Sequence, residues 1–140
     1  MYDKEWIKLR RKSKQLPLMP GKKILIVDDS ETLRAILIFV LEEAGYKVLV
    51  GTDGIDAQKH LTNQTIDLII TDLHMPNLDG IGFIKVVRNH TLYSTTPILF
   101  LTTDTLQNKK DEAREAGATG WIIKPFDQEK LLSAVTKVIK

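Results

Sequence analysis

The hydrophobic residues of this chain form two kinds of pattern, and these alternate from residue 23 to the last residues. Short runs dominated by aliphatic and β-branched residues are typical of parallel strands buried on both faces. The runs indicate strands at 23–27, 46–51, 68–72, 98–102 and 120–123. Between these runs, apolar residues recur at intervals of three and four, which is typical of helices that bury one stripe.

The expected helices have recognisable ends. Ser30 is a good N-cap for a helix over Glu31–Ala44, and Gly45 follows as its C-terminal stop. Asp53 and Asp127 are the predicted caps of the second and the last helix. We place the second, third and fourth helices at about 54–61, 81–88 and 106–116. The repeated order of strand and helix predicts an α/β fold, an open parallel sheet with helices on both faces.

Length and composition narrow the class of protein. The 140 residues suffice for one domain with a core, and 43% hydrophobic with 27% charged residues is ordinary for a globular chain. The absence of cysteine excludes a disulfide scaffold and thiol chemistry, and it fits a reducing compartment such as the cytoplasm. No apolar run approaches the ~18 residues of a membrane span, so we expect no span and no signal peptide.

The charge is divided unevenly along the chain. Residues 1–23 carry a net charge of +6 within a total of +2, so the remainder is mildly acidic. We treat residues 1–21 as a basic N-terminal arm and residues 22–140 as the folded domain. Several roles remain open for the arm: a solvated segment, a contact to nucleic acid or an anionic membrane, an intramolecular or dimer contact, or vector sequence.

Polar side chains stand at the carboxyl ends of four predicted strands. Asp28 and Asp29 follow the first strand, Asp72 ends the third, Thr102 the fourth and Lys124 the fifth. Each has an ordinary alternative, as a helix cap, a strand-end hydroxyl or a surface lysine. Because the carboxyl ends of parallel strands lie at one edge of a sheet, we expect all five side chains to meet in one cleft.

Three carboxylates in one cleft repel one another, by about 4 kcal/mol for each pair ~4 Å apart at an effective dielectric constant of ~20. Protonation or a cation must relieve this repulsion. Oxygen ligands suit a hard ion, and few protein ligands completed by waters suit Mg²⁺. With Lys124 at the same edge, the cleft favours a phosphoryl group, for which a carboxylate can be the nucleophile.

The segments around these strand ends are Ile24-Leu25-Ile26-Val27-Asp28-Asp29-Ser30, Thr71-Asp72-Leu73-His74-Met75-Pro76, Asp79-Gly80, Leu101-Thr102-Thr103 and Lys124-Pro125-Phe126. Together they resemble the receiver domain of response regulators in two-component signalling, in its single-domain, chemotaxis-type form. The resemblance covers residues 22–140. It implies a flavodoxin-like (βα)5 fold, with five parallel strands in the order 2-1-3-4-5.

The resemblance implies roles in phosphoryl chemistry. Asp72 would accept a phosphoryl group from a phosphohistidine, Lys124 would hold an oxygen of that group, and Thr102 would move towards it. The peptide bond between Lys124 and Pro125 is expected to be cis. Such a domain is not an enzyme, because it catalyses only its own phosphorylation and dephosphorylation. Its expected partners are a sensor histidine kinase or phosphotransfer protein and a downstream protein, with a phosphorylation-dependent dimer as a further alternative.

The resemblance also implies a metal site and residues that tune the switch. Mg²⁺ would be bound by two carboxylates and one backbone carbonyl, with a third carboxylate acting through water: these groups belong to Asp29, Asp72, His74 and Asp28. His74 and Asp104 would flank the path of an attacking water. Trp121 stands where the family more often has Tyr or Phe, and it would either enter the space left by Thr102 or serve as a partner-surface aromatic. The expected output face combines the fourth helix, fifth strand and fifth helix.

Other functions remain open. A phosphohydrolase with an Asp nucleophile would want a second acid two residues further on, where this chain has His74. A receiver module excised from a larger regulator is another alternative. A flavin or nucleotide binder of the same fold is disfavoured, because no Gly-rich phosphate loop follows the first strand. The chain ends with the fifth helix, so we expect no output domain and no direct DNA binding.

Overall fold

The computed structural model describes residues 21–139. The basic arm predicted from the charge distribution lies almost entirely outside the described residues. Gly21 is the first residue of the described part, and its N–H donates to the carbonyl of Gly45 at 3.1 Å. Lys47 likewise donates to the carbonyl of Lys22 at 2.9 Å, so the chain joins the fold beside the start of the second strand.

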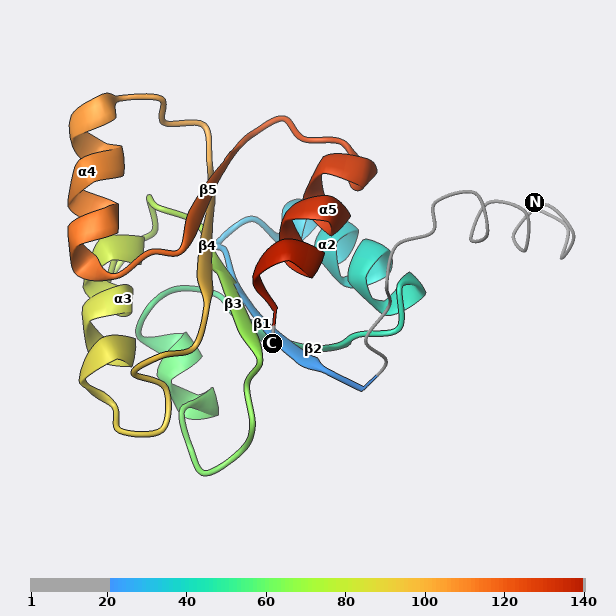
Figure 1. Ribbon diagram of the computed structural model, residues 1–140, viewed down its shortest axis with the longest axis horizontal. Helices are drawn as coiled ribbons and strands as arrows, with labels where there is room; N and C mark the ends of the chain where they lie inside the picture. Colours follow the sequence, from blue (N-terminus) through green and yellow to red (C-terminus); the bar gives the residue numbers. More distant parts are fainter. Residues whose placement is uncertain (1–20, 140) are drawn as a thin grey trace, which may run out of the picture.

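Five parallel strands form one sheet, in the order β2-β1-β3-β4-β5 (Figure 1). Their bounds are Lys23–Val27 for β1, Lys47–Gly51 for β2, Leu68–Thr71 for β3, Ile98–Thr102 for β4 and Gly120–Ile123 for β5. β1, β3 and β4 are buried along nearly their whole length, which explains their unbroken aliphatic sequences. The fold class and the strand order predicted from the sequence are confirmed.

Four α-helices connect and follow these strands: α2 at Glu31–Glu43, α3 at Gly80–Asn89, α4 at Gln107–Ala116 and α5 at Gln128–Val138. Three of them begin at a side-chain cap, as polar residues at these positions predict. Ser30 accepts from the N–H of Leu33, and the caps of α3 and α5 are Asp79 and Asp127. Among residues 21–139, no helix is long and apolar enough to cross a membrane.

The second predicted helix is of a different type. We expected a short helix at about 54–61, and the structure has a 3₁₀ helix, η1, at Asp56–His60. Bonds to the carbonyl three residues back close its turns, from Gln58 to Ile55 and from Leu61 to Gln58. Only Ala57 is buried in it, so packing does not extend the segment into a full α-helix. Asp53 still organises its start, because its carboxylate accepts from the N–H groups of Ile55 and Asp56.

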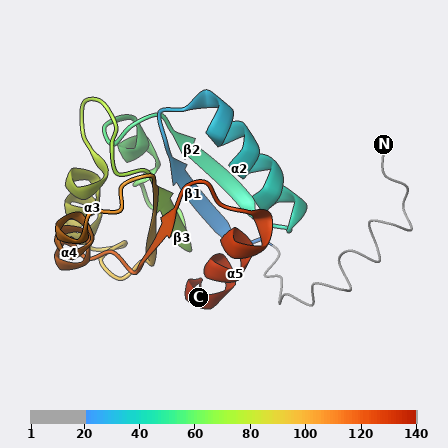
Figure 2. The same ribbon diagram turned by 90° about the horizontal axis from the view of Figure 1, so that it is seen from above.

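The helices cover both faces of the sheet (Figures 1 and 2). Successive residues of a strand point to opposite faces, and β1 shows this directly. Ile24 and Ile26 belong to one core, which includes Leu41 of α2 and Leu131 of α5. The neighbouring residues of β1 belong to the other core, under η1, α3 and α4. Both cores therefore meet at β1, which fixes the position of the strand end that follows.

Candidate functional site

The site lies where the sheet reverses its order, between the carboxyl ends of β1 and β3. Asp28 and Asp29 follow β1, and Asp72 follows β3. The backbone N–H of Asp72 donates to the carbonyl of Val27 at 2.8 Å, which continues the parallel pairing to the strand tips. One carboxylate oxygen from each of the three acids lies within 4.8 Å of the others. Strand direction had predicted this convergence.

Asp28 is the most buried of the three acids, with 2% of its surface exposed. One carboxylate oxygen accepts from the backbone N–H of Ser30 at 2.8 Å, and the other accepts from the Lys124 ammonium at 3.1 Å. Its backbone carbonyl accepts from the Arg34 guanidinium at 2.7 Å. Buried charges are stable only when they are paired and hydrogen-bonded, and Asp28 meets both conditions. Asp29, by contrast, is exposed.

Lys124 places a cation beside the acids, although it is 96 positions from Asp28 in the sequence. Its Nζ lies 3.1 Å from Asp28 Oδ2 and 3.5 Å from Asp72 Oδ2, and its side chain is mostly buried. Its backbone N–H donates to the carbonyl of Thr102 at 2.8 Å, which holds the end of β5 against the end of β4. The peptide between Lys124 and Pro125 is cis, as the resemblance implies.

The electrostatics of Asp72 favour a cation. Burial raises the pKa of this carboxyl above its usual range, and the charge of Asp28 raises it further. Lys124 and the backbone N–H of Leu73 act in the opposite direction but do not cancel the rise. One lysine therefore leaves the three carboxylates incompletely neutralised. Carboxylate oxygens at this spacing, with Asp29 open to solvent, fit a hard divalent ion such as Mg²⁺.

Thr102 ends β4 beside β3, and its side chain is buried. Its hydroxyl oxygen accepts from the backbone N–H of Asp104 at 3.1 Å. Asp104 in turn binds the ring of His74 across the site, with 2.9 Å between Oδ2 and Nε2. The sequence had placed His74 and Asp104 near the site independently of each other. The structure joins them directly.

A glycine allows the chain to pass close to the end of β3. A Cβ on Gly80 would lie 2.2 Å from the carbonyl oxygen of Asp72 and 2.5 Å from the ring of Phe100. No side chain fits at that approach, so α3 can begin here only with glycine. On its other side, Phe100 packs on Trp121 with 5.5 Å between ring centroids and 51° between ring planes. Trp121 thus contacts the same ring that limits the space at Gly80.

The sequence missed three contacts of the site. Arg34 holds the backbone of Asp28 from the first turn of α2, and no motif marked it. Asn77 has a positive φ of 70° and donates to Asp53 at 2.6 Å, which ties the loop after β3 to the loop after β2. Asn tolerates this left-handed conformation better than most residues, and its place next to Met75-Pro76 was the available signal. The third contact is the bond between His74 and Asp104.

An acidic cleft at the strand ends of such a sheet, bridged by a lysine, defines a flavodoxin-like phosphoacceptor domain. The sequence profile of the response regulator receiver domain matches residues 24–136, and the chain belongs to that family. Receiver domains of two-component systems are phosphoacceptor switches and not catalytic enzymes, and this chain is one of them.

Three similar proteins illustrate the range of this family. The chemotaxis protein CheY4 of Vibrio cholerae is 42% identical, with a TM-score of 0.82, over 85% of this chain and 99% of that chain. The receiver domain of the sensor histidine kinase PA1611 from Pseudomonas aeruginosa is 29% identical, with a TM-score of 0.78, over 84% and 97% of the two chains. Its structure contains a magnesium ion coordinated in the active site cleft.

The third is a larger protein, the CAI-1 autoinducer sensor kinase/phosphatase CqsS of Vibrio cholerae. It is 31% identical over an alignment 139 residues long, and the match covers 96% of this chain. This chain spans 20% of the length of that protein. Similar receiver domains therefore occur both alone and as parts of longer proteins.

Proposed function

We propose that Asp72 is the phosphoacceptor and that its donor is the phosphohistidine of a sensor histidine kinase or of a phosphotransfer protein. The observation that carries this assignment is the position of Asp72, with its Oδ2 at 3.5 Å from Lys124 Nζ and beside two further carboxylates. An oxygen of Asp72 attacks phosphorus, and the bond from phosphorus to the donor nitrogen breaks. The nitrogen keeps the bonding pair and takes a proton from water, and an acyl phosphate remains on Asp72.

Each neighbour of Asp72 has a role in this step. Lys124 holds one oxygen of the phosphoryl group, and Thr102 donates its hydroxyl hydrogen to another. Asp29, Asp72 and the backbone carbonyl of His74 are the proposed Mg²⁺ ligands, with Asp28 acting through water. The fit rests on the three carboxylate oxygens that converge within 4.8 Å. Bound Mg²⁺ supplies positive charge against the oxygens of the phosphoryl group.

The experiment that tests the assignment is labelling with acetyl phosphate in the presence of Mg²⁺, followed by intact-mass measurement. We expect wild type to gain one phosphoryl group that is stable in acid and labile in base, and Asp72→Ala to gain none. Asp111→Ala removes an exposed carboxylate of α4 and should label as wild type does. Equal labelling of Asp72→Ala and wild type would contradict the assignment.

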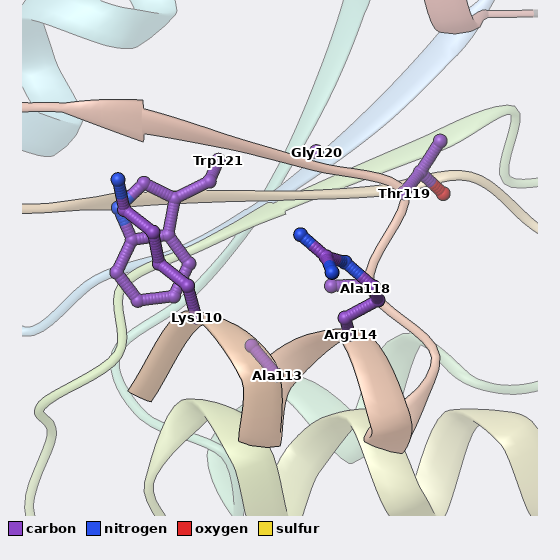
Figure 3. Close-up of a pocket in the computed structure, with 7 residues that line it drawn as sticks. All are labelled: Lys110, Ala113, Arg114, Ala118, Thr119, Gly120 and Trp121. Atoms are coloured by element: carbon purple, nitrogen blue, oxygen red, sulfur yellow. The ribbon is translucent and has the colours of Figure 1, made fainter. Parts of the chain in front are cut away.

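We propose that the output face is formed by α4, β5 and α5, with a downstream protein as its target. A hollow of about 300 Å³ lies between α4 and β5 on this face. Figure 3 shows Lys110 and Trp121 at one end of it and Arg114 nearer to Thr119. The two cations favour an acidic segment of the target. Trp121 connects the hollow with Phe100 and so with the phosphoacceptor strand.

Fluorescence of Trp121 tests this coupling, in a Trp6→Phe background that leaves Trp121 as the sole tryptophan. We expect phosphorylation to change the emission of Trp121, because Thr102 moves and the packing of Phe100 against Trp121 changes. Adding Thr102→Ala should abolish the change in emission while Asp72 still becomes labelled. An emission that does not respond to phosphorylation in the background protein would contradict the coupling.

The same wild-type protein and its variants also test two alternative functions. A phosphohydrolase would turn over small phosphate esters, and the ring of His74 at the position where such an enzyme wants an acid disfavours this. A module of a longer regulator would still label at Asp72, and the similarity to CqsS favours keeping this alternative. We place the transfer of phosphate to Asp72 in the cytoplasm, because the proposed kinase donor obtains its phosphate from ATP.

A further inference from the structure

Two loops flank the phosphoacceptor site, and one side-chain contact joins them. The loop after β3 carries His74, and the loop after β4 carries Asp104. His74 Nε2 lies 2.9 Å from Asp104 Oδ2, although the two residues are 30 positions apart. The side chain of His74 is 61% exposed and that of Asp104 only 12%, so the ring lies over the carboxylate. We call these two side chains the loop clasp.

Asp104 makes two further hydrogen bonds close to His74 and Thr102. Its second carboxylate oxygen accepts from the backbone N–H of Leu106 at 2.9 Å, where α4 begins. Its own backbone N–H donates to the hydroxyl oxygen of Thr102 at 3.1 Å. The Thr102 hydroxyl, the start of α4 and the ring of His74 are therefore held by one residue. None of them can move far without changing a bond to Asp104.

The two groups of the loop clasp determine which of them donates the hydrogen bond. The N–H of Leu106 and then the ring of His74 hold the pKa of the Asp104 carboxyl below its usual range. An ionised carboxylate only accepts hydrogen bonds, so Nε2 of His74 is the ring nitrogen that carries the hydrogen. An amide of similar reach can supply the same donor, whereas a methyl group cannot.

We propose that the loop clasp holds Thr102 and the start of α4 in the resting position, and that it must open before Thr102 can reach a phosphoryl group on Asp72. The inference rests on the proposed function of Asp72. His74 and Asp104 are then positioning residues that act through Thr102. A contact made only in the resting state lowers the population of the competent state, and so slows phosphorylation by a small donor.

The test is a double-mutant cycle on the rate of labelling by acetyl phosphate at saturating Mg²⁺. We expect His74→Ala to raise the rate about threefold, the size of the effect typical of a solvent-exposed charged pair. The change keeps the backbone carbonyl of His74, which is the proposed metal ligand. The His74→Gln variant should return the rate to the wild-type value, because its amide restores a donor to Asp104.

The double variant separates a pair from two independent residues. Asp104→Ala also removes the bond to Leu106, so its own gain in rate should exceed that of His74→Ala. If the clasp exists, adding His74→Ala to Asp104→Ala should give no further gain. His90→Ala removes a histidine outside the clasp and should label at the wild-type rate. Thermal unfolding of each variant checks that a faster rate does not follow from a loosened fold.

The outcomes are distinct. A wild-type protein that acquires no phosphate overturns the proposed function itself. A wild-type protein that is labelled while His74→Ala is unchanged or slower overturns the clasp alone. Gains that multiply in the double variant, or a His74→Gln rate equal to that of His74→Ala, also overturn it. The clasp stands if the gain is present, non-additive and reversed by His74→Gln.

Discussion

Helices α2 and α4 occupy comparable places in the chain but are anchored very differently. Each follows a strand whose carboxyl end leads into the site. α2 begins at a side-chain cap, Ser30, and buries Leu37, Val40 and Leu41 against the sheet. α4 begins at Leu106, which provides no side-chain cap, and Ala113 is the only buried residue in it. The acids therefore stand beside a firmly packed helix, and Thr102 leads into a weakly packed one.

The difference separates two requirements of a switch. Asp28, beside α2, must hold its position so that the metal site exists before phosphate arrives. In the proposed switch Thr102, before α4, moves when phosphate arrives, and a segment with few buried apolar contacts opens at a lower free-energy cost. The contacts of Asp104 compensate for the missing cap of α4 in the resting state. One side of the cleft thus lies beside the firmly packed α2, and the other lies beside the weakly packed α4.

The largest expected effect comes from the same substitution made in each helix. Leu41→Ala removes a fully buried side chain from α2 and should lower the free energy of unfolding by about 3 kcal/mol. Leu106→Ala removes a side chain that is 59% exposed at the start of α4 and should cost less than about 0.5 kcal/mol. Urea unfolding measures both. Similar losses for the two variants would break the comparison.

Asp72→Asn tests how much the ionised carboxyl of Asp72 destabilises the fold. The pKa of Asp72 is raised in the fold, chiefly by burial, so its ionised form opposes folding. This cost is absent below the ordinary pKa of Asp, about 3.9, and develops as the pH rises through the folded pKa. Without Mg²⁺ at pH 7, Asp72→Asn should therefore be more stable than wild type.

The pH dependence and the metal distinguish this cause from a change in packing. The difference between Asp72→Asn and wild type should shrink as the pH falls towards 4, when the carboxyl of wild type becomes protonated. Saturating Mg²⁺ at pH 7 should raise the unfolding free energy of wild type more than that of the variant, because a ligand of the folded state stabilises it. A wild type that is the more stable protein at pH 7 without metal would contradict the assignment of charge repulsion.

Most of the fold could be predicted from the sequence because both cores are built on strands with unbroken runs of apolar residues. A run such as Ile98–Thr102, buried at every position, has no other stable place than the middle of a covered sheet. The short length of η1 and its 3₁₀ type have a physical cause as well. Apolar spacing indicates a turn of helix, but the number of residues that packing will hold in that turn depends on neighbours elsewhere in the chain. Within Asp56–His60, Ala57 is the only residue that is buried against the rest of the fold.

Some contacts of the site could also be predicted from the sequence, and others could not. The meeting of Asp28, Asp72 and Lys124 followed from strand direction, which is a property of the whole sheet and tolerates errors of one residue. The contacts of His74 with Asp104 and of Asn77 with Asp53 depend on the paths of loops. Loop paths are set by tertiary contacts that no local pattern encodes. The sequence therefore predicted which groups lie together, and the structure was needed to show the loop contacts around them.

The smallest expected effect would make α4 more like α2. Leu106→Ser introduces a side-chain cap where α4 has none, without adding a charge beside Asp104. Ser is among the favoured N-cap residues, so Leu106→Ser should be more stable than Leu106→Ala by about 0.5–1 kcal/mol. Hydrogen exchange of the α4 amides should slow by a comparable factor, while exchange in α2 stays as in wild type. If the looseness of α4 assists switching, the same variant should also take phosphate from acetyl phosphate more slowly than Leu106→Ala. Slower exchange in α4 with an unchanged labelling rate would show that the weak packing of this helix is incidental to the movement of Thr102.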